Sequence, residues 1–133
     1  MRFFVKSFAE LRSSYADVDF LIVYITEAHA VDEWPIRSGR YHGGEPVHVR
    51  QPKRLADRIE VAKTFLARYG LLGDLPTLVD SPEDGDPFCA AFCPWPIRFY
   101  VVQHGKMSHI AMPNHAEYSL CKVREALRSG SNG

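Results

Sequence analysis

The sequence F-L-I-V-Y-I-T-E-A-H-A-V-D-E-W, residues 20–34, indicates the fold more clearly than any other stretch of the chain. Its first five residues form an apolar run rich in β-branched and aromatic side chains, which predicts a strand buried on both faces. Open α/β sheets bind their ligands at the carboxyl ends of such strands. Glu27, His29 and Trp34 follow this strand and are therefore candidate site residues. The alternative is that the strand simply ends here in solvated residues.

The rest of the chain alternates between helical and extended patterns. Apolar residues recur at i, i+4, i+7 and i+11 from Phe4 and again from Leu55, which predicts helices over residues 3–15 and 53–69. Gly70 would then cap the second helix at its C-terminus. The other predicted elements are strands over 19–25, 75–79, 97–103 and 106–111, a loop over 35–52, turns at 81–87 and His104–Gly105, and a closing helix that starts at Asn114 or at Ser119.

Length and composition limit the fold and the function. The 133 residues predict one domain, residues 1–128, followed by a flexible tail at 129–133. Sixteen basic and sixteen acidic residues give no net charge, which argues against nucleic acid or an anionic membrane as the main partner. No apolar run approaches the ~20 residues of a membrane-spanning helix. We therefore expect a cytoplasmic protein.

The cysteines indicate neither a disulfide framework nor a redox pair. There are three of them, Cys89, Cys93 and Cys121, and the first two are too far apart for a C-x-x-C motif. A metal site that combines them with His104, His109 or His115 is an alternative, but the spacing does not repeat like a zinc module. We expect reduced thiols and no metal ion.

The polar segment after the first strand also resembles a known family. Residues 24–34 match Y-I-x-E-A-H-x-x-D-G-W, a signature of the iodothyronine deiodinases, which are selenoenzymes with a thioredoxin-like fold. Glu33 stands where that family usually has glycine. Further segments resemble the family in its own order, namely Phe4–Val23, Arg54–Arg58, Leu78–Asp80, Pro96–Lys106, Tyr118 and Val123–Leu127.

The resemblance implies a fold and an activity. The fold would be an α/β, thioredoxin-like, three-layer arrangement with a mixed central sheet, and the strand that normally precedes the first helix would be missing. The activity would be that of an oxidoreductase for reductive dehalogenation, or for related thiol or selenol redox chemistry, with an external thiol as reductant and no bound cofactor. The family's selenocysteine would lie just upstream of Met1. We expect that an in-frame UGA codon was read as a stop; the alternative is a truncated paralogue.

The resemblance also implies roles for individual residues. His29 would donate or shuttle a proton, and Glu27 would orient its imidazole; a structural histidine is the alternative. Substrate would contact Trp34, Tyr24, Pro96 and Arg98. Pro96 occupies the place of the cis-proline of thioredoxin-like folds, so we expect a cis Trp95–Pro96 bond, with an ordinary trans proline as the alternative.

Some positions depart from the family. The chain reads Gln51-Pro52-Lys53 where the family has Q-H-R, although His48 lies nearby, and Ile97 replaces a glutamate of the proton relay. Residues 111–114 replace a glycine-rich stretch. These changes argue against thyroid hormone as substrate, and a small aromatic or halogenated compound is expected instead.

Three alternatives stay open. The chain could be a non-catalytic binding module that has lost its nucleophile. Cys89 or Cys93 could supply a relocated thiol. An exposed sheet edge, left by the missing strand, would favour homo-oligomers.

Overall fold

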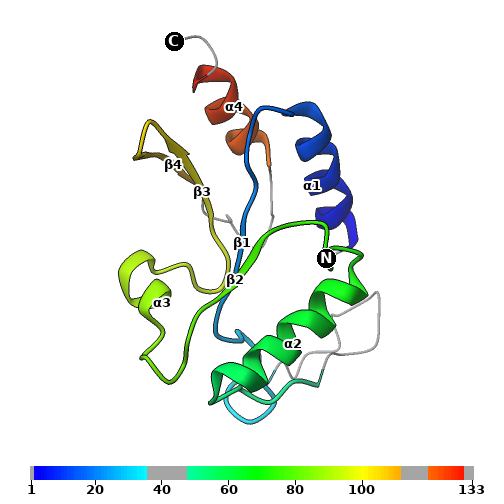
Figure 1. Ribbon diagram of the computed structural model, residues 1–133, viewed down its shortest axis with the longest axis vertical. Helices are drawn as coiled ribbons and strands as arrows, with labels where there is room; N and C mark the ends of the chain where they lie inside the picture. Colours follow the sequence, from blue (N-terminus) through cyan, green and yellow to red (C-terminus); the bar gives the residue numbers. More distant parts are fainter. Residues whose placement is uncertain (1, 36–47, 112–119, 131–133) are drawn as a thin grey trace. The chain divides into compact units, whose positions relative to one another are not determined.

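The computed structural model describes residues 2–35, 48–111 and 120–130, with side chains from residue 8 to residue 129 within those ranges (Figure 1). The chain has a mixed α/β composition and divides into two compact units. The first unit joins residues 1–20 to 97–133, and the second contains residues 21–96. Most of the predicted loop over 35–52, together with Asn114 and Ser119, lies outside the described residues.

The second unit contains a parallel pair of strands and a crossover helix. β1 (Ile22–Tyr24) pairs with β2 (Thr77–Val79), and Val23 lies opposite Leu78. The connection between them carries α2 (Leu55–Arg68), which packs against β2, as parallel strands require a long crossover (Figure 1). The predicted α2 is confirmed, and Gly70 just beyond it has φ +68°, the left-handed conformation of a C-terminal cap.

A buried arginine joins α2 to the end of β2. The side chain of Arg58 is 2% exposed, donates to the backbone carbonyl of Asp80 at 2.9 Å and forms an ion pair with Asp86. Because a buried charge is costly without partners, this contact fixes the position of α2 along the strand.

The short helix α3 (Pro87–Phe92) was not predicted from the sequence, which indicated only a turn up to Pro87. The carboxylate of Asp80 accepts hydrogen bonds from the backbone N–H groups of Phe88 at 2.8 Å and Cys89 at 2.9 Å. These N–H groups have no partner within the helix, so an acceptor from the end of β2 stabilises its first turn.

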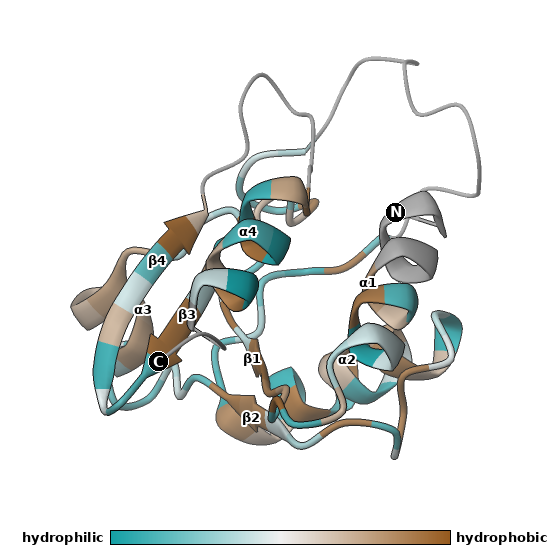
Figure 2. Ribbon diagram, turned by 90° about the horizontal axis from the view of Figure 1, so that it is seen from above, coloured by the Kyte–Doolittle hydropathy of each residue, from teal (hydrophilic) through white to brown (hydrophobic). Residues whose placement is uncertain are grey.

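The first unit packs two helices on an antiparallel hairpin. Its elements are α1 (Arg2–Ser14), β3 (Phe99–Gln103), β4 (Lys106–Ala111) and α4 (Cys121–Gly130). Phe99 lies opposite Ala111, and the predicted turn at His104–Gly105 is confirmed, with φ +51° and +72°. The core of this unit consists of Leu11, Val101, Ala111, Leu120, Val123 and Leu127. Figure 2 shows the matching division of α4 into a hydrophobic and a hydrophilic side.

Several boundaries differ from the predicted ones. The strands β1 and β2 have three residues each, and Ile22–Tyr24 are half-buried instead of fully buried, because β1 is paired over this short length only. The helix α4 begins at Cys121, after both predicted starts, which lie outside the described residues, and it ends at Gly130. The mixed central sheet that would join the two strand pairs stays a prediction.

Candidate functional site

The loop that follows β1 begins with a tyrosine–carboxylate contact. The hydroxyl of Tyr24 donates a hydrogen bond to the Glu27 carboxylate, and its ring lies against Phe65 of α2 with centroids 5.7 Å apart. Burial, followed by the hydrogen bond to Glu27, raises the pKa of Tyr24. The Tyr24 hydroxyl therefore stays protonated at neutral pH, and its hydrogen bond holds the Glu27 side chain near the end of β1.

The same loop is bound by a second segment, residues 48–53. Gln51 is 8% exposed, and its side-chain Oε1 accepts from the Glu27 backbone N–H at 3.0 Å while its Nε2 donates to the Glu27 carbonyl at 3.1 Å. Nε2 also donates to the Glu33 carboxylate at 3.0 Å, and the Gln51 backbone N–H donates to Asp32 at 2.8 Å. The Val31 N–H donates to the Val49 carbonyl at 2.9 Å, so the two segments lie side by side.

Two ion pairs complete this contact at the surface. Glu33 pairs with Lys53, and an oxygen of Asp32 lies 3.5 Å from Nε of Arg50. The Gln51 N–H lowers the pKa of Asp32, and the Lys53 ammonium, then the Gln51 amide, lowers that of Glu33. Both carboxylates are therefore ionised at neutral pH and hold the loop against residues 50–53.

His29 is exposed and lies beside two stacked indoles. Its Nδ1 is 3.3 Å from the Trp34 carbonyl, and because a carbonyl only accepts, Nδ1 carries the proton and Nε2 is the atom free to exchange one. The His29 and Trp34 rings have centroids 5.6 Å apart. Trp34 in turn stacks on Trp95 at 5.7 Å with an interplanar angle of 15°.

The predicted cis peptide bond at Trp95–Pro96 is confirmed. Trp34 thus lies next to the residue that precedes Pro96, and His29 contacts Trp34. Glu27 instead bonds to Tyr24 and Gln51. The imidazole is oriented by the Trp34 carbonyl instead of the predicted Glu27 carboxylate.

Arg98 belongs to the other unit, where it is half-buried and donates to the Ile97 carbonyl at 2.8 Å. Its predicted contact with substrate stays a prediction.

The cysteines were the alternative source of a nucleophile. None of the three forms a disulfide. Burial, then the hydrogen bond to Asp80, raises the pKa of the Cys89 thiol to about 11. A thiol with such a pKa is protonated at neutral pH and is a poor nucleophile. Cys93 is exposed. Within the described ranges no three His, Cys, Asp or Glu side chains are close enough to hold a metal ion, and His115 lies outside those ranges.

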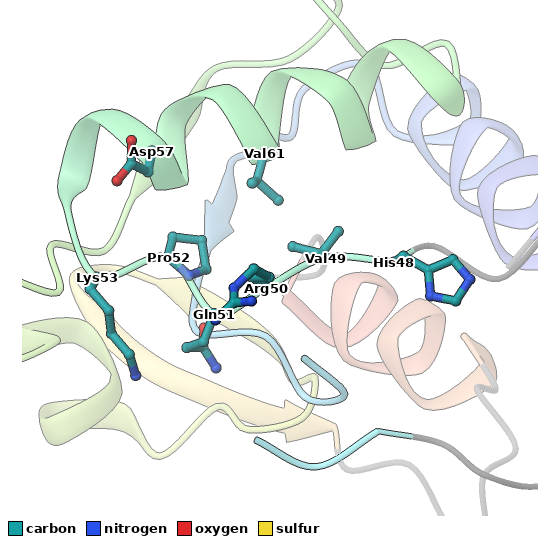
Figure 3. A pocket seen from close by; sticks show the side chains of 8 residues that line it. All are labelled: His48, Val49, Arg50, Gln51, Pro52, Lys53, Asp57 and Val61. Carbon is teal, nitrogen blue, oxygen red and sulfur yellow. The ribbon is translucent and has the colours of Figure 1, made fainter. Parts of the chain in front are cut away.

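An open hollow of about 430 Å³ lies between residues 48–53 and α2 (Figure 3). Its lining includes His48, Arg50, Lys53, Asp57 and Val61. His48, which lies three residues before the Gln51-Pro52-Lys53 segment, is among the residues that line this hollow; its role in place of the family's second histidine stays a prediction. In the described part of the chain, no helix is long and apolar enough to cross a membrane.

Two residues of this site were missed in the sequence. Gln51 matches the glutamine of the family's Q-H-R motif, whereas the prediction from sequence concerned only the histidine of that motif. Trp95 was noted only as the residue before Pro96.

Comparison with known proteins shows similarity to one family. A family model described as iodothyronine deiodinase matches residues 2–130. Type I iodothyronine deiodinase of Xenopus laevis is 32% identical over 90 residues, which cover 67% of this chain and 31% of that protein. Thyroxine 5-deiodinase of Gallus gallus is 31% identical over 121 residues, 90% of this chain and 43% of that protein. Type II iodothyronine deiodinase of Petromyzon marinus is 29% identical over 126 residues, 92% and 40%. The chain spans less than half the length of these relatives.

Proposed function

Because the chain belongs to the iodothyronine deiodinase family, we propose that it is part of an oxidoreductase that removes halogen reductively from a small aromatic substrate. Related thiol or selenol redox chemistry falls under the same proposal. The electrons would come from an external thiol.

The observation that carries the proposal is the position of His29 beside the indole pair. Trp34 is 62% exposed and Trp95 39%, so the stacked rings offer an aromatic surface to solvent. A substrate ring that stacks on Trp34 would lie next to the imidazole, since the two side-chain rings are 5.6 Å apart. With Nδ1 bound to the Trp34 carbonyl, His29 can deliver a proton from Nε2.

The reaction involves four participants, namely the halogenated substrate, the selenolate or thiolate, His29 and the external thiol. A selenolate or thiolate attacks the halogen, the electrons of the carbon–halogen bond stay on carbon, and carbon takes a proton from His29. The nucleophile is left as a selenenyl or sulfenyl halide. Two equivalents of the external thiol release halide ion and regenerate the nucleophile, and they are oxidised to a disulfide. One of the protons released returns to His29.

The nucleophile itself is not among these 133 residues, which contain no selenocysteine. The raised pKa of Cys89 disfavours that thiol as a substitute. We propose a selenocysteine or cysteine encoded upstream of Met1, on a strand of a thioredoxin-like fold. The order α1, β1, α2, β2, α3, β3, β4 and α4, with the cis Trp95–Pro96 bond just before β3, supports that fold.

Iodothyronines are not the substrate we expect, because Ile97 cannot carry the protons of the family's glutamate. We propose halogenated phenols instead, since a single ring can stack on the exposed indole of Trp34.

The test begins with the genomic sequence upstream of the Met1 codon. If a frame continues there through a UGA or cysteine codon, the extended protein is expressed and halide release from iodinated and brominated phenols is measured with dithiothreitol. We expect release that depends on the upstream residue and falls in His29→Ala. His104→Asn is the matched control, since it replaces an exposed histidine and keeps the left-handed turn.

The same experiment separates catalysis from simple binding. A binding module would show quenching of indole fluorescence by the phenols without halide release, and this result would overturn the enzymatic proposal.

A further inference from the structure

Gln51 is a buried polar residue in a segment whose charged residues are exposed. The side chains of Arg50 and Lys53 are 81% and 71% exposed, whereas Gln51 is 8% exposed in a segment without regular secondary structure. Figure 3 shows the side chains of Gln51 and Lys53 extending away from α2. A buried amide is costly unless it is fully hydrogen-bonded, so the contacts of Gln51 define its role.

These contacts hold both ends of the loop that carries His29. At one end, Oε1 and Nε2 bind the N–H and the carbonyl of Glu27 at 3.0 and 3.1 Å, a two-point contact of the kind made between strands. At the other end, Nε2 bonds to Glu33 and the backbone N–H to Asp32. His29 lies between these ends.

The second end also determines the orientation of the imidazole. Trp34 directly follows Glu33, and the Trp34 carbonyl is the partner of His29 Nδ1 at 3.3 Å. Without Gln51, the bond from Val31 to Val49 and the ion pairs of Asp32 and Glu33 would still join the loop to the second segment. Tyr24 would still bond to the Glu27 carboxylate, and the Ala30 carbonyl would still accept from the Glu33 and Trp34 N–H groups. None of these contacts ties the backbone of Glu27 to Glu33.

Only a carboxamide of this length satisfies the site. The Glu27 N–H needs an acceptor, while the Glu27 carbonyl and the Glu33 carboxylate need donors. A glutamate at this position would lack donors and would repel Glu33. A leucine would leave the Glu27 N–H and carbonyl without these partners, and Glu33 would keep only Lys53.

We propose that Gln51 is a positioning residue, which fixes the loop from Glu27 to Glu33 and so sets the place of the His29 imidazole beside Trp34. The inference rests on the proposed function only in the role given to His29. Its test therefore uses a structural signal that does not require activity.

The first measurement is amide hydrogen exchange and NMR on the unmodified 133-residue chain. The Glu27 amide should exchange ~10-fold or more slowly than in an unstructured peptide, because Gln51 accepts its hydrogen bond. A nuclear Overhauser contact should join the His29 and Trp34 rings. Free exchange at Glu27 would overturn the inference without any variant.

The second measurement uses Gln51→Leu and Gln51→Glu, with Gln103→Glu as control. Gln103 is a half-buried glutamine of the other unit whose Nε2 lies 3.5 Å from the Ala126 carbonyl, so it undergoes the same amide-to-acid change away from the loop. We expect Gln51→Leu to lose the protection of the Glu27 amide, whereas Gln51→Glu, which keeps an acceptor for this amide, loses only the two bonds of Nε2. Both variants should lose the His29–Trp34 ring contact while the β3–β4 amides stay protected. The control should keep both signals. Unchanged signals in a folded Gln51 variant would overturn the inference.

Activity distinguishes the two proposals. In the extended, active protein, Gln51→Leu should lower kcat by ~10²-fold with a smaller change in KM, because it misplaces a proton donor. If the unsubstituted extended protein releases no halide while the NMR result holds, the proposed function fails and the positioning role of Gln51 stands.

Discussion

The indole of Trp34 stacks on that of Trp95, with ring centroids 5.7 Å apart and planes inclined by 15°. Both residues belong to the second unit. Trp34 lies in the loop after β1, and Trp95 lies in the segment after α3. Their contact brings the loop of His29 to the residue before Pro96.

This contact can be tested directly because the chain has only two tryptophans. Stacked indoles couple electronically, so we expect a circular-dichroism couplet that disappears in Trp34→Phe and in Trp95→Leu. Loss of the aromatic pair should cost ~0.5–1.5 kcal/mol of unfolding free energy. If each variant removes only the signal of one isolated indole, so that the circular-dichroism contributions of the two indoles are additive, the stack does not form in solution.

Arg58 should be essential for the stability of the second unit. Arg58→Ala would leave Asp86 without its cation and the Asp80 carbonyl without its donor, and we expect a loss of ~3 kcal/mol in chemical denaturation. Lys63→Ala is the control, because it breaks an exposed pair with Glu60 and should cost less than ~0.5 kcal/mol. Equal effects of the two variants would show that the Arg58 contact is not formed.

The helices were predictable from sequence because their signal is local. In α1 and α2 the apolar residues recur with the helix period, and Gly70 marks the end of α2. The bounds of β4 were also predicted, since the turn at His104–Gly105 fixes its start. In contrast, α3 has six residues, and its first turn depends on Asp80, the residue that follows β2.

The candidate site was predictable in part for the same reason. Glu27, His29 and Trp34 were found because they follow a recognisable strand. Gln51 and Trp95 acquire their roles only through contacts with residues distant in the sequence, at 24 positions from Glu27 in the case of Gln51. No local pattern distinguishes such a glutamine from an exposed one.

Alkaline pH should destabilise the fold through Cys89. Its pKa rises from an ordinary 9.0 to about 11 in the folded chain, so the folded state favours the neutral thiol. The resulting stabilisation is complete below pH 9 and is lost as the pH rises toward about 11. Tyr24, whose pKa is also raised from 10.0, adds to the loss at higher pH.

Thermal unfolding between pH 8 and 11 checks this expectation. Cys89→Ala should show a flatter decline of Tm over that range than the unsubstituted chain, whereas Cys121→Ala, which changes an exposed cysteine, should not. Parallel curves for all three proteins would contradict the raised pKa of Cys89.

The second unit should promote self-association. Among the described residues, β1 and β2 pair only with each other, and a two-stranded sheet is marginal by itself. Leu21 and Leu78 are 54% and 57% exposed there. We expect concentration-dependent oligomers in size-exclusion chromatography, reduced in Leu78→Lys. A monomer with a sharp unfolding transition at all concentrations would contradict this prediction.

The last prediction concerns the 133-residue chain without any addition. It should not deiodinate iodothyronines with dithiothreitol, because it contains no selenocysteine and burial keeps the Cys89 thiol protonated. In the extended protein with its upstream selenocysteine or cysteine, His29→Ala should lower halide release by ~10²- to 10⁴-fold if the imidazole is the general acid. Cys89→Ser and Cys93→Ser should have little effect there. Cys93 is exposed and so is the better placed of the two for a relocated thiol. Activity of the unextended chain that disappears in Cys93→Ser would therefore show that this cysteine, and no upstream residue, is the nucleophile.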